Sequence, residues 1–222
     1  MHLSASWPLV WLLREGGMPV AQIEESIVAR IAHLTSVHSR DDTRIFHKMC
    51  VGLAKAGHEV ILIVADGQGN EERQGVRILD VGKATARSVR VAKSAYAVYR
   101  RALSLKADLY HLHDPELLIA GVSLRLSRLR VIFDSHEDFP LQIMSKSYLP
   151  AASRRLISFA VTIFERFACR CLSAVVTATP TIRDKFIASR IPALDIRNYP
   201  LLSEMENPES IHGKAKELCY VG

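Results

Sequence analysis

The sequence lacks the glycine patterns with which many nucleotide-binding folds hold phosphate groups. No G-x-G-x-x-G follows the first predicted strand, and no G-x-x-x-x-G-K-[ST] occurs anywhere. A G-x-S-x-G nucleophile elbow is also missing. These absences argue against a dinucleotide oxidoreductase and a P-loop NTPase, and they remove the sequence signal for a serine hydrolase.

Cysteine is scarce, and its spacing does not indicate a metal or disulfide framework. The four cysteines are Cys50, Cys169, Cys171 and Cys219, and none forms a C-x-x-C pair. Cys169 and Cys171 would point to different sides of a helix. No H-E-x-x-H or comparable histidine spacing occurs. We therefore expect reduced thiols, no metal and a cytoplasmic location.

Long hydrophobic runs are absent as well. The apolar stretch from Trp7 to Leu13 is broken by Pro8, and it is far shorter than the ~20 residues of a membrane span. No basic segment precedes it and no cleavage site follows it. We expect residues 1–28 to be a poorly ordered extension, with Met18 as a second candidate initiator.

Apolar strand-like segments alternate with helical segments through most of the 222 residues. The predicted strands are 30–37, 58–65, 76–81, 108–113, 130–134, 174–178 and 194–198. The predicted helices are 43–56, 87–105, 115–127, 150–171 and 180–189. The 150–171 helix carries Leu156, Phe159, Ile163 and Phe167 at helical spacing. This alternation predicts an α/β domain over residues 29–199, a doubly wound parallel sheet of about seven strands.

The composition changes after Tyr199. Residues 200–216 begin with an acidic, proline-containing stretch without periodicity, which is typical of an interdomain linker. Residues 217–222 resemble a new strand ending in glycine. We expect them to be the first strand of a second domain that this sequence does not contain.

Polar residues follow three of the predicted strands. Strands one and four flank the switch point of such a sheet, and strand five lies next to strand four. In the common strand order 3-2-1-4-5-6, ligands bind beyond the carboxyl ends of strands one and four. Asp114 and Pro115 fit a helix start, as N-cap and first helical residue, which leaves His113 unexplained. Each loop could also be a polar segment that simply leaves the sheet. The residues brought together would be His38, Arg40, Asp41 and Arg44, then His113, Asp114 and Glu116, then His136, Glu137 and Asp138.

The segment between Asp80 and Asp108 holds seven basic residues and no acidic one. On the predicted helix Arg87, Arg90, Lys93, Arg100 and Arg101 share one side, and Val89, Ala92, Tyr96, Tyr99 and Leu103 occupy the other. This side is either a solvated surface or a contact for anionic lipid headgroups or a polyanionic acceptor. Nucleic acid is the least supported partner, because no aromatic residues interleave with the charges.

Several segments, in order, resemble the N-terminal domain of GT-B-fold family 4 glycosyltransferases. His33 to Lys48 followed by Leu53-Ala-Lys-Ala-Gly57-His58-Glu59-Val60 resembles the opening of that family. His111-Leu-His113-Asp114-Pro115-Glu116 matches its fourth-strand histidine motif, and Ile132 to Glu137 its fifth-strand motif. Tyr220-Val-Gly222 matches the first strand of its second domain. The likeness covers residues 30 to 222, although the Gly-Gly turn that many relatives have after strand one is replaced by His38 to Arg44.

The resemblance implies two Rossmann-like domains facing each other across a cleft, with the acceptor on the first and the nucleotide-sugar donor on the second. Members are mostly retaining and metal-independent, and their donor site includes a Glu-x7-Glu motif in the second domain. The resemblance therefore implies that this chain lacks most of the donor site and is inactive alone. No cofactor is implied beyond the nucleotide-sugar co-substrate.

Roles carried over from the resemblance concern the three loops. His113 would be catalytic and lie against the donor sugar as charge develops at the anomeric carbon. Arg40 and Arg44 would bind an acceptor phosphate or carboxylate. The full set of acceptor-side candidates is Arg40, Asp41, Arg44, His136, Glu137 and Asp138.

These roles and the basic helix together suggest a glycan or lipid-linked acceptor in surface polysaccharide synthesis, with peripheral placement at the inner membrane face. Two alternatives stay open. One is a nucleotide-sugar epimerase of the same architecture. The other is a non-catalytic module that binds a glycan, a lipid headgroup or a protein.

Overall fold

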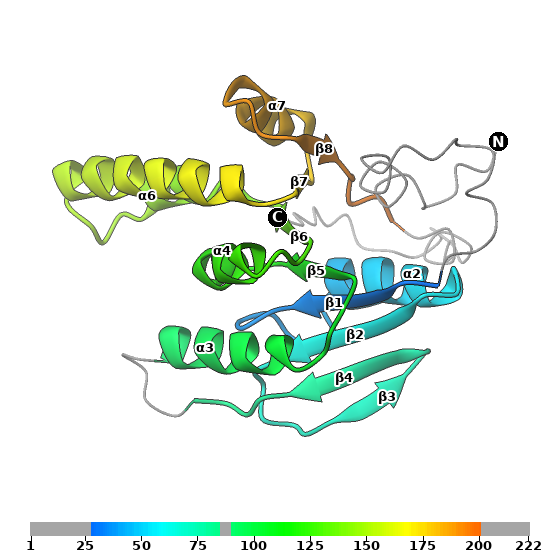
Figure 1. Cartoon of the computed structure of the whole chain (residues 1–222). Helices are drawn as coiled ribbons and strands as arrows, with labels where there is room; N and C mark the ends of the chain where they lie inside the picture. Colours follow the sequence, from blue (N-terminus) through cyan, green and yellow to red (C-terminus); the bar gives the residue numbers. More distant parts are fainter. Residues whose placement is uncertain (1–27, 85–89, 201–222) are drawn as a thin grey trace, which may run out of the picture.

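The computed structural model describes residues 28–84 and 90–200, which form one open sheet with helices on both faces (Figure 1). The sheet has eight strands in the order β3-β4-β2-β1-β5-β6-β7-β8. The strands are β1 (Arg30–Leu34), β2 (Glu59–Val64), β3 (Glu71–Arg73), β4 (Val76–Asp80), β5 (Leu109–Leu112), β6 (Val131–Ser135), β7 (Ala174–Thr177) and β8 (Ala193–Asp195). The predicted α/β class, the parallel sheet and the strand order around β1 are confirmed.

The sequence prediction missed β3. This strand pairs antiparallel with β4, whereas every other neighbouring pair of the sheet is parallel. Gln74 and Gly75 join the two strands with positive φ angles of 52° and 76°, which suits a tight hairpin turn. The strand consists of Glu71, Glu72 and Arg73. It carries no apolar signal because it lies at the edge of the sheet and does not face the core.

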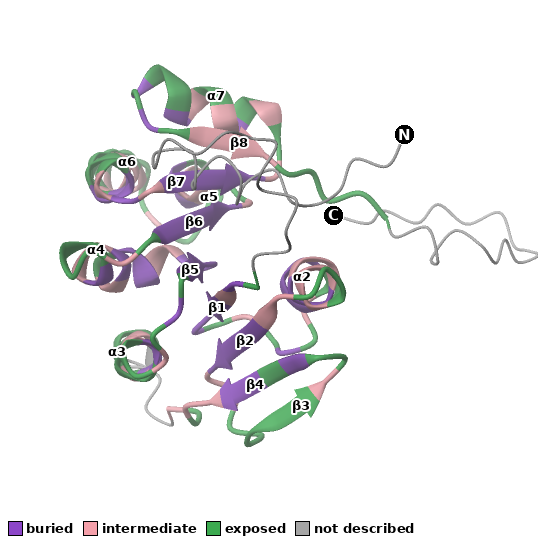
Figure 2. Ribbon diagram, turned by 45° about the vertical axis from the view of Figure 1, so that its right-hand side comes forward, coloured by how far each residue is buried: buried purple, intermediate pink, exposed green. Residues whose placement is uncertain are grey.

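Helical segments cover the two faces of the sheet unequally. The helices α3, α4 and α6 form a layer on one face, and α2 lies on the other (Figures 1 and 2). The segments are η3 (Thr43–Cys50, a π-helix), α2 (Val51–Lys55), α3 (Arg90–Leu103), η4 (Pro115–Leu117, a 3₁₀ turn), α4 (Leu118–Leu126), α5 (Phe139–Ser145), α6 (Ala151–Cys171) and α7 (Pro180–Ala188).

The main core lies between the sheet and the helix layer. Tyr110, Leu112 and Phe133 of the central strands are at most 2% exposed, and they share a cluster with residues of α3, α4 and α6. A second cluster places Ile45 and Phe46 of η3 against β2 and β4. The central strands are apolar on both sides because both sides are covered, as in parallel sheets generally.

The face of α3 that packs against the core differs from the one predicted. Tyr96 and Leu103 are 61% and 42% exposed, whereas Ser94, Val98 and Ala102 are buried. Tyr99 of the predicted side does pack against the core, beside these residues. The basic residues Lys93, Arg100 and Arg101 are exposed, as predicted, and Arg87 lies outside the described residues.

The predicted N-terminal extension and linker lie outside the described part except for residues 28 and 200, and the predicted strand at 217–222 lies wholly outside it. These assignments therefore stay predictions. Within the described residues, none of the helices combines the length and the apolar content that crossing a bilayer requires.

Candidate functional site at the carboxyl edge of the sheet

The carboxyl ends of β1, β5 and β6 bring the three predicted polar loops together. His33 in β1 is in register with His111 in β5, and Leu34 O accepts from the backbone N–H of His113. The loops enclose a pocket of about 240 Å³. Its lining residues are Val37, His38, His113, Asp114, Pro115, Glu116, Phe133, Asp134, Ser135, His136, Glu137, Phe139, Gln142 and Glu165.

Asp114 joins two of these loops and does not cap its own helix, which corrects the sequence prediction. It occupies the N-cap position, but its side chain accepts no hydrogen bond from η4. Its Oδ2 instead accepts from Thr35 Oγ1 at 2.9 Å, Ser36 N at 2.5 Å and Val37 N at 3.3 Å. The side chain is fully buried, so these donors stabilise a charge that burial would otherwise disfavour. Asp114 thus fixes the loop after β1 against the loop after β5.

Asp134 is the second buried aspartate of the site. Arg44 binds it with two hydrogen bonds, Nη2 to Oδ1 at 2.7 Å and Nε to Oδ2 at 2.8 Å. Burial raises the pKa of Asp134, but hydrogen bonds from Arg44 and His113, together with the nearby imidazole of His136, outweigh it and hold that pKa well below its ordinary value. The paired guanidinium therefore keeps a negative charge in the lining of the pocket.

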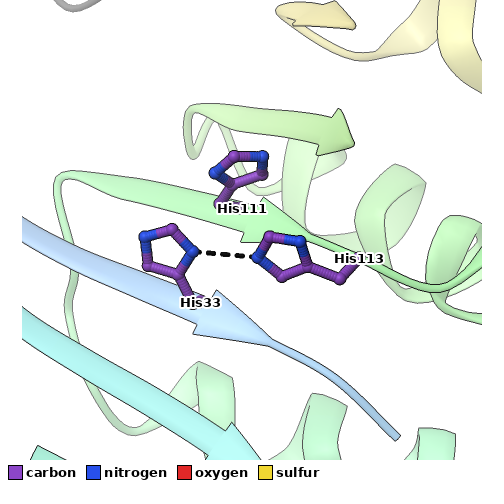
Figure 3. A group of neighbouring side chains, drawn as sticks. All are labelled: His33, His111 and His113. Carbon is purple, nitrogen blue, oxygen red and sulfur yellow. Dashed lines mark hydrogen bonds between the residues drawn. The ribbon is translucent and has the colours of Figure 1, made fainter. Parts of the chain in front are cut away.

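Three histidines, His33, His111 and His113, lie together near the carboxyl ends of β1 and β5 (Figure 3). His33 Nδ1 and His113 Nε2 share a hydrogen bond of 2.9 Å, and His113 Nδ1 lies 3.4 Å from Asp134 Oδ2. The ring of His111 stacks on that of His113, with centroids 4.5 Å apart. Burial, and then the neighbouring imidazoles, lower the pKa of His33 and of His111 well below 6.5. Both rings are therefore neutral near physiological pH.

The histidine cluster could in principle hold a metal ion, because its ligand nitrogens lie within 4.8 Å of one another. Two ring nitrogens are already joined by the His33–His113 hydrogen bond. His33 Nε2 and His111 Nε2 have no partner among the described residues, and both rings line a separate apolar cavity of about 180 Å³. The absence of a metal stays a prediction.

Two further histidines are the accessible imidazoles of the pocket. The side chains of His38 and His136 are 29% and 20% exposed, and their ring centroids are 5.2 Å apart. Each has a buried aspartate behind it: His38 Nε2 is 3.2 Å from Asp114 Oδ1, and His136 Nδ1 is 3.6 Å from Asp134 Oδ2.

The carboxylates around these two histidines raise both pKa values. The carboxylate of Asp42, 3.5 Å from His38 Nδ1, is the main cause for His38, and that of Asp134, 3.6 Å from His136 Nδ1, is the main cause for His136. The pocket can therefore present protonated imidazoles, which donate hydrogen bonds to an anionic or hydroxyl-rich ligand.

Glu116 lies on the same wall as His38. Burial and the nearby Asp114 raise the pKa of Glu116, although Ser36 Oγ donates to its Oε1 at 3.1 Å. Such a carboxyl can exchange a proton closer to neutral pH than an ordinary glutamate. The pocket wall therefore offers both a proton donor and a carboxylate acceptor.

The structure separates the other predicted residues into two groups. His113, His136 and Glu137 line the pocket, and Asp138 caps α5 beside it, accepting from Leu141 N and pairing with Lys185. Arg40 and Asp41 do not line the pocket. Arg40 is buried and binds Asp66 through Nη2 at 2.6 Å and Nε at 2.7 Å, and Asp41 pairs with Arg73. Arg44 does not line the pocket either; it binds Asp134 and lines a separate apolar cavity.

Asp134, His33 and Ser36, which hold the site together, are not among the residues predicted from the sequence. Asp134 carried a usable signal, since it is a charged residue at the end of the apolar run Val131-Ile132-Phe133. His33 and Ser36 carried none, because their role depends on residues about 80 positions further along the chain.

Comparison with solved structures finds proteins that are similar in fold. Sucrose-phosphate synthase from Thermosynechococcus elongatus matches with a TM-score of 0.57 at 12% identity, over 81% of this chain and 53% of that protein. An α,α-trehalose 6-phosphate synthase from Burkholderia multivorans matches with a TM-score of 0.47 at 14% identity, over 73% and 43%. The chain thus spans about half the length of the first of these enzymes. No curated protein sequence matches.

The sequence family described as glycosyl transferase 4-like domain matches residues 43–201. This match covers most of the chain and includes η3, the β5 and β6 loops and the helix layer. The chain belongs to this family, and its fold is the Rossmann-like domain of GT-B glycosyltransferases.

Proposed function

We propose that this chain is the N-terminal, acceptor-side half of a glycosyltransferase that transfers a sugar from a nucleotide-sugar donor to a glycan or lipid-linked acceptor. The observation that carries the proposal is the pocket at the β1/β5 switch point in a domain of this family. Ligands of doubly wound sheets bind beyond the carboxyl ends of the strands at this point. Surface polysaccharide synthesis and a retaining mechanism are part of the same proposal.

His136 is the residue we propose for direct contact with the substrate. Its ring is partly exposed in the pocket, and Asp134 favours its protonated form. A protonated imidazole can stabilise negative charge that develops on a leaving phosphate or on a reacting hydroxyl. Glu137 lines the same wall and is proposed to orient an acceptor hydroxyl, while Asp138 holds the start of α5.

His113 remains the proposed catalytic residue, with a more specific geometry. Its side chain is fully buried, and both ring nitrogens face protein groups, His33 on one side and Asp134 on the other. In this arrangement His113 acts on the pocket by holding Asp134 against His136. Direct contact with a sugar requires its ring to leave one of these partners.

The remaining residues of the first loop are proposed to act indirectly. The guanidinium groups of Arg40 and Arg44 are already bound to Asp66 and Asp134. They reach an acceptor phosphate or carboxylate only by sharing N–H groups with these partners. Asp41 could meet an acceptor only at the outer rim, where it pairs with Arg73.

The test uses the protein expressed from the complete reading frame, with a screen of nucleotide-sugar donors. His136→Ala and His113→Ala should each lower turnover by at least about tenfold, while His47→Ala, an exposed histidine on η3 outside the pocket lining, should not change it. Near-normal turnover in both pocket variants would overturn the site assignment. Isomerisation of a donor without an acceptor would indicate an epimerase, and sugar binding without turnover would indicate a binding module.

The basic side of α3 is proposed to face an anionic surface or a polyanionic acceptor. Lys93, Arg100 and Arg101 are exposed, and Arg90 starts the helix. Arg87 belongs to the same proposal from the sequence alone. Contact of this helix with a membrane would place the protein peripherally at the cytoplasmic face.

A further inference from the structure

An apolar stripe on α6 is exposed to solvent. Leu156, Phe159, Ile163 and Phe167 are 69%, 64%, 54% and 66% exposed, and Ile157 and Phe164 are each 40% exposed. Helical spacing of this kind ordinarily faces a core. In α6 the buried residues are instead Glu165, Ala168 and Cys169. An exposed group of six large apolar side chains on one helix marks an interaction site.

The stripe is bordered by arginines. At 3.6 residues per turn, Leu156, Phe159, Ile163 and Phe167 fall within an arc of about 80°. The exposed residues Arg155 and Arg166 follow on one side of this arc, and Arg170 lies within it near the C-terminal end of the helix. The outer side of α6 therefore combines an apolar centre with a positive border, as in helices that lie in the plane of a membrane surface.

The apolar exposure continues across the neighbouring helices. Ile119 and Leu126 of α4 are 67% and 81% exposed, and Tyr96 of α3 is 61% exposed. The three helices lie side by side in one layer, and their exposed sides face away from the sheet (Figure 2). Of the eighteen large apolar side chains exposed in the described residues, eleven belong to α3, α4 and α6. We call this outer side the helix-layer surface.

The charge of the helix-layer surface has one sign. Helices α3, α4 and α6 contain four, one and four basic residues, and their single acidic residue is Glu165. Glu165 is 2% exposed and accepts from Lys185 Nζ at 3.0 Å, so it does not reach the outer side. An occupant of this surface must therefore be both apolar and anionic.

We infer that the helix-layer surface docks on an anionic lipid bilayer, with the apolar stripe of α6 inserted at the level of the headgroups. A second copy of the chain would bring like charges together, whereas anionic headgroups complement them. The bilayer also offers apolar depth for Phe159 and Phe167, which a free phosphate or an acidic glycan does not. This inference extends the proposed contact of α3 and is independent of glycosyl transfer, because its test measures no turnover.

The test is co-sedimentation of the 222-residue chain with vesicles of phosphatidylcholine alone or with phosphatidylglycerol added at about one third. We expect binding to the anionic vesicles, weakened by salt, because exposed charges are screened over a Debye length of about 8 Å at physiological salt. Phe159→Ser with Phe167→Ser should weaken binding at least about tenfold, since buried aromatic area drives interfacial insertion. These side chains are exposed, so the variant keeps its fold, which circular dichroism checks.

Matched controls separate the surface from other parts of the chain. Ile187→Ser changes an apolar residue on α7 that is 51% exposed and lies outside the layer, so it should bind as the wild type does. The double variant Arg155→Glu with Arg166→Glu should abolish binding to the anionic vesicles, because it reverses the charge next to the apolar stripe. Unchanged binding in the phenylalanine variant would overturn the inference, as would failure of the wild type to bind anionic vesicles. A wild-type dimer that the phenylalanine variant dissociates would assign the surface to a second copy.

Discussion

The carboxyl edge of the sheet and the helix-layer surface both carry charge, but they use it in opposite ways. At the edge, Asp114 and Asp134 have fully buried side chains surrounded by donors. On the helix-layer surface the basic residues are exposed and mixed with exposed apolar side chains. Buried charges need partners fixed by the fold, whereas exposed charges are free to meet a partner outside it. The fold should therefore depend strongly on the first region and weakly on the second.

The largest effect should come from Arg44→Met. Removing this guanidinium leaves Asp134 buried without its bidentate partner, which should lower the free energy of unfolding by about 3–5 kcal/mol. The matched control is Arg30→Met, which breaks an ion pair with Glu59 between side chains that are 41% and 39% exposed. It should cost at most about 1 kcal/mol. Urea denaturation measures both.

The double variant Arg44→Met with Asp134→Leu tests the cause of that loss. Because it removes the uncompensated charge together with its partner, it should recover a large part of the stability. Equal losses in Arg44→Met and Arg30→Met would contradict the contrast between buried and exposed charge.

Asp114→Ala should have the next largest effect. It leaves the hydroxyl of Thr35 and the backbone N–H groups of Ser36 and Val37 without their acceptor, at a cost of about 1–3 kcal/mol. Asp108→Ala is the control, since the exposed Asp108 accepts from one backbone group, Arg30 N at 2.7 Å. A loss in Asp114→Ala no larger than in Asp108→Ala would show that Asp114 does not hold the loop.

The histidine cluster should make stability depend on pH. The pKa values of His33 and His111 are lowered in the folded chain. Below about pH 6.5 the unfolded chain therefore binds more protons than the folded chain, and the free energy of unfolding decreases as the pH decreases. The raised pKa values of His38 and His136 act oppositely, and their contribution is lost as pH rises through the folded values.

His111→Leu isolates this dependence. Between pH 6 and pH 5 the variant should lose less stability than the wild type, by up to about 1.4 kcal/mol per pH unit. His47→Leu, at an exposed position, should follow the wild type. Parallel pH profiles for the wild type and His111→Leu would mean that His111 is not held neutral by burial.

The smallest effect should come from the helix-layer surface itself. Phe167→Ala should change the free energy of unfolding by less than about 0.5 kcal/mol, because the ring is 66% exposed. Phe186→Ala, at a phenylalanine of α7 that is 1% exposed, should cost about 3–5 kcal/mol. Thermal and urea unfolding of the Phe167→Ala and Phe186→Ala variants would show whether the α6 stripe contributes to the stability of the fold.

The sheet could be predicted from the sequence because its signals are local. An apolar run such as Val60 to Val64, preceded by a segment with helical periodicity, indicates a covered parallel strand. The edge strand β3 could not be predicted, since pairing with β4 alone makes it a strand. The outward face of α6 could not be predicted either, because periodicity gives the apolar side of a helix but not the element it packs against.

The candidate site was predictable in its position but not in its bonding. Strand order alone brings the 38–44 loop, His113 and His136 to one edge. Which arginine binds which aspartate depends on side-chain reach in three dimensions, and Arg40 and Arg44, predicted as one acceptor pair, belong to two separate ion pairs. The expected N-cap role of Asp114 was wrong because the donors of the β1 loop compete for the same carboxylate.

The central position of β1 between β2 and β5 also has a consequence for how the chain is made. During synthesis from the N-terminus, β2 emerges soon after β1 and covers one of its edges. The other edge waits for β5, so His33 meets His113 only after 80 further residues have been added. Arg44 must wait longer, since one of its acceptors, the carbonyl of Ile196, lies 152 residues onward. The pocket, whose lining residues run from Val37 to Glu165, therefore closes only after most of the domain has been synthesised, although His33 is among the first residues of the sheet to appear.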